Sequence, residues 1–220
     1  MFSIFKEADN KEIESNLDAM LADCIAMFDL AMAALFGDRP ASEVQDEIWG
    51  LDKQVNRRER AVRRELLVRG AVRHAEFEQG LLLAYMSVAK DLERIGDYCK
   101  NIWDLANIGV QLGEQNGVEK MREEAATVRE YLVAGRKAFA QQDQDAVHDL
   151  IPKLDAVAHG HDEIVFQLAR SDAPASEAVP QALYYRFLKR IVSHLENVLT
   201  SVVMPLDRID YYKPKDQKNG

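Results

Sequence analysis

Apolar residues recur three and four positions apart along almost the whole chain, which is the spacing of helices that bury one face. Val, Ile and Thr never alternate with polar residues over a stretch long enough to indicate a strand. Clusters of glycine, proline and polar residues interrupt the pattern at 36–43, 69–76, 112–119, 141–145 and 171–180. The sequence therefore predicts an all-α protein of six long helices.

Three positions predict how individual helices begin, bend and end. Ser42 is a suitable N-terminal cap for the second helix, because its hydroxyl can accept a hydrogen bond from a free backbone N–H. Pro152 is expected to kink the fifth helix near its start, and Pro205 to kink or end the sixth.

The two halves of the chain resemble each other. The segment "LERIGDYCKNI" from Leu92 matches "LKRIVSHLENV" from Leu188, at an offset of 96 residues. The segment "LDKQVNRRERAV" from Leu51 matches "LDAVAHGHDEIV" from Leu154, at an offset of 103. Two matches in the same order indicate duplication. We therefore expect two tandem three-helix bundles with pseudo-twofold symmetry, at residues 10–113 and 114–212, and a disordered tail at 213–220.

Composition narrows the class of protein. The chain has 220 residues, 37 acidic against 28 basic, and a formal charge of -9, which argues against a nucleic-acid binder. Its longest basic run, Asn56–Arg64, is best interpreted as a solvated helix face. Cys24 and Cys99 are expected as buried free thiols. Without a signal peptide or a long apolar segment, the protein is expected to be soluble and cytoplasmic.

A line of polar side chains follows the third predicted helix. Glu93, Asp97 and Asn101 are four residues apart, with Gly96 between the two acids. At about 100° per residue they lie within about 80° of one another, on the side away from the apolar stripe. Di-iron bundle enzymes instead direct Glu and Glu-x-x-His ligands into the core, and no Glu-x-x-His occurs in the sequence.

The second predicted helix offers two further oxygen donors, Asp52 and Asn56, at a related spacing. If the two helices are neighbours, five oxygen-bearing side chains face one another across a groove. Such a set suits Mg²⁺, Mn²⁺ or iron. A solvated polar face explains the same spacing equally well.

The stretch "DLERIGDYCKNI" resembles the repeat signature of the PhoU family, the accessory and regulatory proteins of phosphate transport. "LDKQVNRRERAVRRELL", from Leu51 to Leu67, resembles the second-helix segment of that family, and the resemblance extends over residues 10 to 210 or so. It implies spectrin-like three-helix repeats whose E/D-x-x-x-D motifs hold surface metal clusters, often iron. It also implies a non-enzymatic adaptor between a phosphate ABC transporter and a phosphate-sensing histidine kinase, which represses phosphate-starvation genes. A homodimer is expected from base rates.

The second repeat departs from the family signature. Lys189 and Ser193 occupy the positions of the first repeat's Glu93 and Asp97, while Asn197 is retained. On the fifth helix Asp155 is kept, and the next motif position is His159. A lysine at a ligand position repels a divalent ion, so metal is expected in the first repeat only. His159 and His161 are expected as exposed helix histidines.

Two other functions fit the same sequence. One is a histidine phosphotransfer bundle with His159 or His194 as the phospho-acceptor. The other is a helical interaction module that binds no ion. Gly96 also has two interpretations: access for a metal or backbone, or a close helix crossing.

Overall fold

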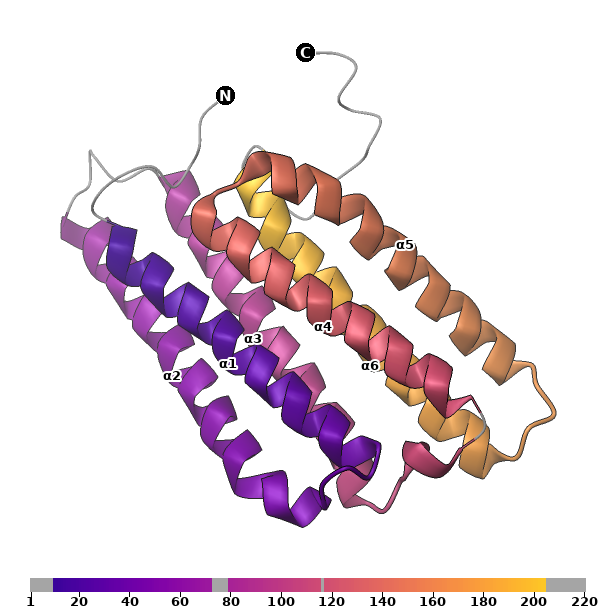
Figure 1. Ribbon diagram of the computed structural model, residues 1–220. Helices are drawn as coiled ribbons and strands as arrows, with labels where there is room; N and C mark the ends of the chain where they lie inside the picture. The colour runs from indigo at the N-terminus through magenta and orange to yellow at the C-terminus, as the bar shows by residue number, and fades with distance from the viewer. Residues whose placement is uncertain (1–9, 73–78, 116, 205–220) are drawn as a thin grey trace.

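The computed structural model describes residues 10–72, 79–115 and 117–204, which form six α-helices (Figure 1). The described residues contain no strand, so the all-α prediction of six long helices is confirmed. The elements are α1 (Lys11–Leu35), α2 (Ala41–Val72), α3 (Gln79–Asn107), the one-turn 3₁₀ helix η2 (Leu112–Glu114), α4 (Val118–Gln141), α5 (Gln144–Ala169) and α6 (Ala175–Val203).

The helices form two groups of three. Helix α1 packs against both α2 and α3, while α6 packs against α5 and α4. Helix α4 contacts α5 only sparsely. The two groups join through α3 against α6 and α1 against α4, with α2 and α5 at the outer edges (Figure 1). The expected arrangement of two three-helix bundles is therefore observed.

The apolar stripe of α3 forms the centre of the first bundle. All six positions assigned to it from sequence are buried, with at most 2% of any residue exposed: Val88, Leu92, Ile95, Cys99, Ile102 and Trp103. Burial of each large apolar side chain contributes about 1.5–3 kcal/mol before the entropy of ordering is subtracted. Cys24 is also buried and unbonded to Cys99, as predicted. Its thiol donates to the carbonyl oxygen of Leu92 at 3.2 Å.

The ends of several helices differ from the sequence-based predictions. Ser42 is not a cap, because α2 begins at Ala41 and Ser42 is its second residue. Helix α5 runs from Gln144 to Ala169 with Pro152 inside it, and the kink expected at Pro152 stays a prediction. Helix α6 begins at Ala175, so Pro180, placed in the preceding break, lies inside the helix near its start. Helix α6 ends at Val203, while Pro205 and the tail at 213–220 lie outside the described residues.

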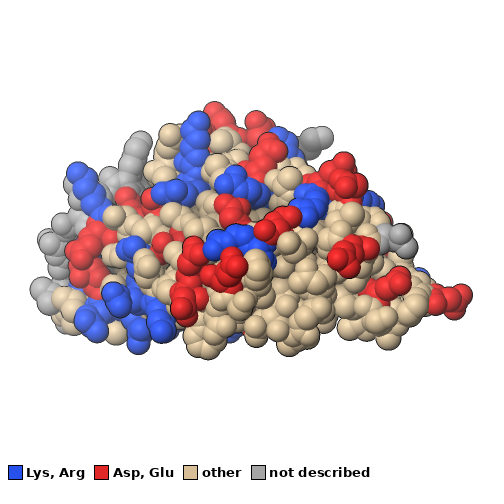
Figure 2. All heavy atoms as spheres, turned by 60° about the horizontal axis from the view of Figure 1, so that its bottom comes forward, with Lys and Arg blue, Asp and Glu red and all other residues tan. Residues whose placement is uncertain are grey.

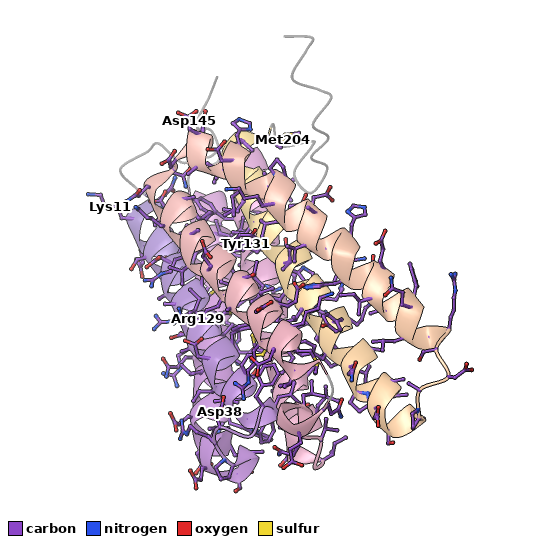
Figure 3. The ribbon with its side chains drawn as sticks, turned by 45° about the vertical axis from the view of Figure 1, so that its right-hand side comes forward. Lys11, Asp38, Arg129, Tyr131, Asp145 and Met204 are labelled. Atoms are coloured by element: carbon purple, nitrogen blue, oxygen red, sulfur yellow. The ribbon has the colours of Figure 1, made fainter. Side chains whose placement is uncertain are left out.

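Three arginines on α4, spaced seven residues apart, connect the two bundles. Each donates two hydrogen bonds to one aspartate of α1 or of the loop after it, and every N···O distance lies between 2.7 and 2.9 Å. The pairs are Arg122 with Asp38, Arg129 with Asp29, and Arg136 with Asp18. Arg129 and Asp38 can be followed in Figure 3. Because two helical turns separate successive arginines, one face of α4 carries all three and fixes the antiparallel register of α1 and α4.

A polar network joins α3 to α6. Asp91 is only 8% exposed, and its Oδ1 lies 2.7 Å from His194 Nδ1 and 3.3 Å from Asn197 Nδ2. Arg190 donates from Nε to the Tyr98 hydroxyl at 3.2 Å. The Tyr98 ring stacks on His194, with centroids 5.7 Å apart. Asp91 thus anchors the second bundle to the first through groups that are largely removed from water.

The surface carries charges of both signs. The face in Figure 2 interleaves acidic and basic side chains instead of presenting a basic stripe. None of the described helices is long and apolar enough to span a membrane.

Candidate functional site

The predicted polar line lies at the surface where α2 packs against α3. We call this surface, which carries Asp52 and Glu59 of α2 and Glu93 and Asp97 of α3, the acidic groove. Its members are not all as exposed as the helix projection suggested. The side chains of Glu93, Asp52 and Asp97 are 14%, 20% and 30% exposed, whereas Asp104, on the same side of α3, is exposed. The prediction that the whole line faces away from the packed interior is therefore wrong for Glu93. The projection did not include the neighbouring helix, which covers one flank of α3.

Basic side chains neutralise the acids of this groove. Lys90 Nζ lies 2.6 Å from Glu93 Oε2, and Arg94 NH1 lies 3.1 Å from Asp97 Oδ2. Lys100 connects the helices, with its Nζ 3.2 Å from Asp52 Oδ1 and 4.0 Å from Asp97 Oδ1. The predicted approach of Asp52 to the α3 line is thus observed, but the Lys100 ammonium lies between the two carboxylates.

A further acid, Glu59, belongs to the groove and was not assigned to the site from sequence. It is 6% exposed, and its Oε1 lies 2.6 Å from Arg63 NH2 without hydrogen-bond alignment. Burial raises the pKa of Glu59, and the negative charge of Glu93 adds to the shift. Burial and Glu93 likewise raise the pKa of Asp97. The sequence signal for Glu59 was its position seven residues after Asp52, because residues seven apart lie on the same face of a helix.

The acids are close enough to affect one another electrostatically but do not surround a common point. In the parts of the chain that the structure describes, no three His, Cys, Asp or Glu side chains are grouped as metal ligands. Asn56 and Asn101 are half-buried, and the backbone carbonyl oxygen of Asn56 accepts a hydrogen bond from Arg60 Nε at 3.1 Å. The groove therefore offers carboxylate and amide oxygens, and lysine and arginine side chains neutralise its acids.

Gly96 lies on the packed side of α3 and not in the acidic groove. A Cβ at this position would be 3.6 Å from Cys24 Sγ and from Met27 Sδ, and 3.8 Å from Val55 Cγ1. These are atoms of α1 and α2, so the position is a helix crossing, the second of the two sequence-based interpretations.

In the second repeat, salt bridges replace the acid pairs. Lys189, at the position of Glu93, pairs with Asp162, at the position of Glu59, and Arg186 NH1 lies 3.2 Å from the same aspartate. Desolvation is the largest single influence on the pKa of Asp162 and would raise it, but the hydrogen bonds and positive charges of Lys189 and Arg186 together lower the pKa below its ordinary value. A stable ion pair therefore stands where the first repeat has two carboxylates.

The histidines differ from one another in accessibility. His159 is 75% exposed, as expected, and its Nδ1 lies 3.1 Å from Asp155 Oδ1. His194 is 12% exposed, with Nδ1 at Asp91 and Nε2 at 3.4 Å from Arg190 NH2, which makes it a poor phospho-acceptor. The prediction that His161 is exposed is wrong, because only 1% of it is accessible. His161 lies seven residues after the buried Leu154, so the apolar spacing of α5 already placed it inward.

Comparison with known proteins supports the predicted resemblance. Residues 17–106 match the family model described as the PhoU domain. The fold matches the crystal structure of PhoU from Pseudomonas aeruginosa with a TM-score of 0.73 and 24% sequence identity, over 91% of this chain and 98% of that one. No curated protein matches the sequence significantly.

Proposed function

From a PhoU domain at residues 17–106 and a PhoU fold over nearly the whole chain, we propose that this protein is a non-enzymatic regulator of phosphate uptake and phosphate-starvation signalling. It acts in the cytoplasm as an adaptor between a phosphate ABC transporter and a sensor histidine kinase. The family match carries this proposal, because it covers the helices that form the acidic groove.

The fold suits an adaptor. Long helices present extended faces without loops that would have to be ordered on binding, and a partner helix can lie along such a face. Mixed surface charge and the net charge of -9 favour protein partners over nucleic acid. The α1–α4 and α3–α6 contacts hold the two repeats as one body, so both present their surfaces in a fixed relation.

We further propose that the acidic groove holds a divalent cation, with iron, Mn²⁺ and Mg²⁺ as the candidates. Glu93, Asp97 and Asp52 supply carboxylates, while Asn56 and Asn101 supply amide oxygens. The fit is chemical: burial and then the negative charge of Glu93 raise the pKa of Asp97, and a bound cation relieves the repulsion between the two carboxylates. Lys100 now serves as the counter-charge between Asp52 and Asp97, so binding requires its side chain to swing out.

Deletion of the gene tests the regulatory function. Phosphate-starvation genes should be derepressed in phosphate-rich medium, and expression of the intact chain should restore repression. A pull-down from phosphate-replete cells, identified by mass spectrometry, should recover transporter and kinase subunits. Unchanged expression in the deletion strain counts against the proposal, and salt-sensitive, sequence-specific DNA binding overturns it.

The metal prediction is tested separately, by elemental analysis and thermal melts. Glu93→Ala combined with Asp97→Ala should remove bound metal, and the free energy of unfolding of the apoprotein should change by no more than about 0.5 kcal/mol, since repulsion and ion pairs are lost together. The matched control is Asp155→Ala in the second repeat, which should leave metal content unchanged. If the double variant keeps its metal, or Asp155→Ala loses it, the assignment is wrong.

A further inference from the structure

The outward side of α2 carries a row of cations with a large apolar side chain at each end. We call this row the basic face of α2, and its members are exposed and spaced three or four residues apart: Trp49, Lys53, Arg57, Arg60, Arg64 and Leu67. At about 100° per residue they lie within about 80° of one another, on the side opposite the buried Ile48, Val55 and Val62. Helix α2 lies at the outer edge of the molecule in Figure 1, and the described helices leave this side open to solvent.

The four cations of the basic face have no acidic partners within the described residues. Three of them form no ion pair there, and Arg60 donates to the backbone carbonyl oxygen of Asn56 in its own helix. By contrast, Arg58 and Arg63, which lie among them in the sequence, each pair with an aspartate or a glutamate. Like charges three and four residues apart on a helix repel one another. A negatively charged partner on the basic face would relieve this repulsion.

The basic face presents positive charge alone. The acids of α2 within residues 49–68 lie on other sides of the helix: Asp52 and Glu59 belong to the acidic groove, and Glu65 pairs with Arg69 at 2.7 Å. The whole chain has a formal charge of -9. A negatively charged partner is therefore attracted to this side of the molecule and repelled by the rest, which fixes the orientation of the complex.

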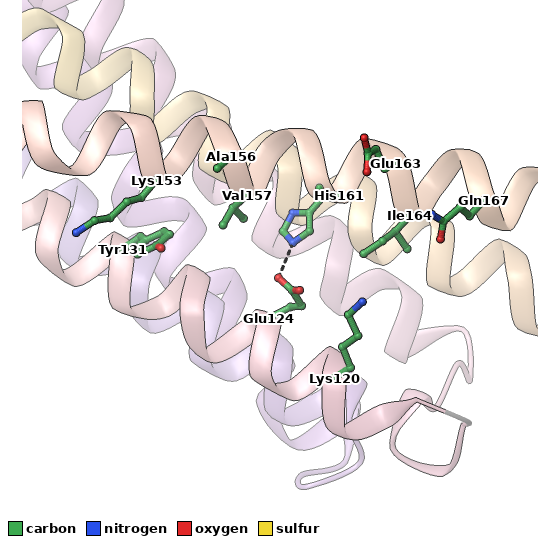
Figure 4. Close-up of a pocket in the computed structure, with 11 residues that line it drawn as sticks. Lys120, Glu124, Tyr131, Lys153, Ala156, Val157, His161, Glu163, Ile164 and Gln167 are labelled. Carbon is green, nitrogen blue, oxygen red and sulfur yellow. Dashed lines mark hydrogen bonds and ion pairs between the residues drawn. The ribbon is translucent and has the colours of Figure 1, made fainter. Parts of the chain in front are cut away.

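The duplicated positions of the second repeat carry no cation. At the offset of 103 residues, the four cationic positions correspond to Ala156, Gly160, Glu163 and Gln167 of α5. In the second repeat these positions border a pocket of about 530 Å³ between α4 and α5, beside which Figure 4 shows Ala156, Glu163 and Gln167. The fold therefore does not require positive charge at these positions, and the basic face is a property of the first repeat.

We propose that the basic face of α2 docks on an anionic phospholipid bilayer. The cations are spread along the helix and reach separate phosphate groups, and a bilayer surface offers many of these. The contact is peripheral, because the apolar side of α2 stays in the core and none of the described helices can span a membrane. The proposal goes beyond the regulatory function proposed above and does not depend on it.

The two ends of the basic face favour lipid over an acidic protein surface. Trp49 is 49% exposed and Leu67 is 68% exposed, and both lie on the same line of the helix. An indole is favoured at the level of the lipid headgroups, where its ring is in apolar surroundings and its N–H remains hydrated. The side chains at both ends can therefore enter the interface while the cations between them contact phosphate.

Co-sedimentation of the intact chain with lipid vesicles tests the proposal. The protein should bind vesicles of equal parts phosphatidylcholine and phosphatidylglycerol, and it should not bind vesicles of phosphatidylcholine alone. Raising the ionic strength from about 0.01 to about 1 M should release it, because the screening length falls from about 30 to about 3 Å. Arg57→Gln with Arg64→Gln should weaken binding at least about tenfold, since each cation near an anionic surface contributes roughly fivefold.

Tryptophan fluorescence provides a readout that is specific to the basic face. Trp103, the other tryptophan of the chain, is only 2% exposed and packed in the core. A blue shift of the emission on addition of the anionic vesicles therefore reports Trp49 entering the interface. Trp49→Phe should abolish this shift, while the variant still sediments with the vesicles.

The matched control is Lys120→Gln with Lys137→Gln on α4, which changes the net charge by the same amount through exposed side chains. It should bind the anionic vesicles as the wild type does. Both double variants alter only exposed side chains, so both are expected to fold. The proposal is overturned if the two double variants bind alike, or if phosphatidylcholine vesicles bind the wild type equally well. It is also overturned if the wild type does not bind the anionic vesicles, which would leave an acidic protein surface as the partner of the basic face.

Discussion

Single residues at the helix crossings differ in the space that surrounds them. A Cβ at Gly96 would meet its neighbours at ordinary contact distances, whereas a Cβ at Gly135 would be 2.9 Å from Leu195 Cδ1 and 3.3 Å from Cδ2. Leu195 is 1% exposed, so it has little room to yield. Gly96→Ala should therefore stabilise the protein by up to about 1 kcal/mol through helix propensity. Gly135→Ala should destabilise it by about 1 kcal/mol, because overpacking exceeds that gain. Urea unfolding of both variants measures the difference, and a destabilised Gly96→Ala would contradict it.

The pH dependence of a single carboxyl can be predicted at the same scale. Burial, together with the nearby charge of Asp155, raises the pKa of Glu196 to about 7. The folded state therefore binds this proton more tightly than the unfolded state. Stability from this group is present at low pH and is lost as pH rises from the unfolded value towards 7. Glu196→Gln should leave stability nearly unchanged at pH 5 and raise it by about 1 kcal/mol at pH 8, allowing for partial exposure. Thermal melts at both pH values test this, and an equal effect at the two would refute it.

At the scale of the helix, Asp143 caps the N-terminus of α5, whereas Ser42, the expected cap of α2, lies inside its helix. Asp143 Oδ1 accepts from Ala146 N at 3.0 Å, which satisfies one of the free N–H groups at the start of α5. Asp143→Ala should cost about 1 kcal/mol. Ser42→Ala is the matched control and should change stability by less than about 0.5 kcal/mol, because Ser42 lies inside α2. Chemical denaturation measures the stability of both variants, and an equal loss of stability in Ser42→Ala would show that Ser42 is a cap.

At the scale of the whole molecule, Asp91 holds the two repeats together. It accepts hydrogen bonds from His194 and Asn197 of α6 in a site from which water is largely excluded. Removing the carboxylate leaves both partners unsatisfied, so Asp91→Ala should destabilise the protein by about 3 kcal/mol. Asp104→Ala, an exposed change on the same helix, should have little effect. Equilibrium unfolding measures both, and a loss for Asp91→Ala no larger than that of the control would show that the network does not hold the repeats together.

The sequence by itself determined the helices, their duplicated order and the buried stripe of α3. Apolar spacing is a local property of each helix, so it identified all six buried positions of the α3 stripe. Motif spacing likewise placed Asp52 opposite the Glu93–Asp97 line, since both helices pack within one repeat. The spacing left the end of each helix less certain, because Ser42 and Pro180 are compatible with positions just outside or just inside a helix.

Only the tertiary structure decided which polar groups are removed from water and which charges meet. A helix projection treats α3 as isolated, so it could not show that α2 covers Glu93 or that Lys100 lies between Asp52 and Asp97. The arginines of α4 pair with aspartates that are 84, 100 and 118 residues away in the sequence, and no local pattern encodes such separations. His161 shows the same limit, because its burial depends on how α5 packs against the neighbouring helices. Burial and ion pairing are properties of neighbouring helices, and the packing of the two repeats sets them.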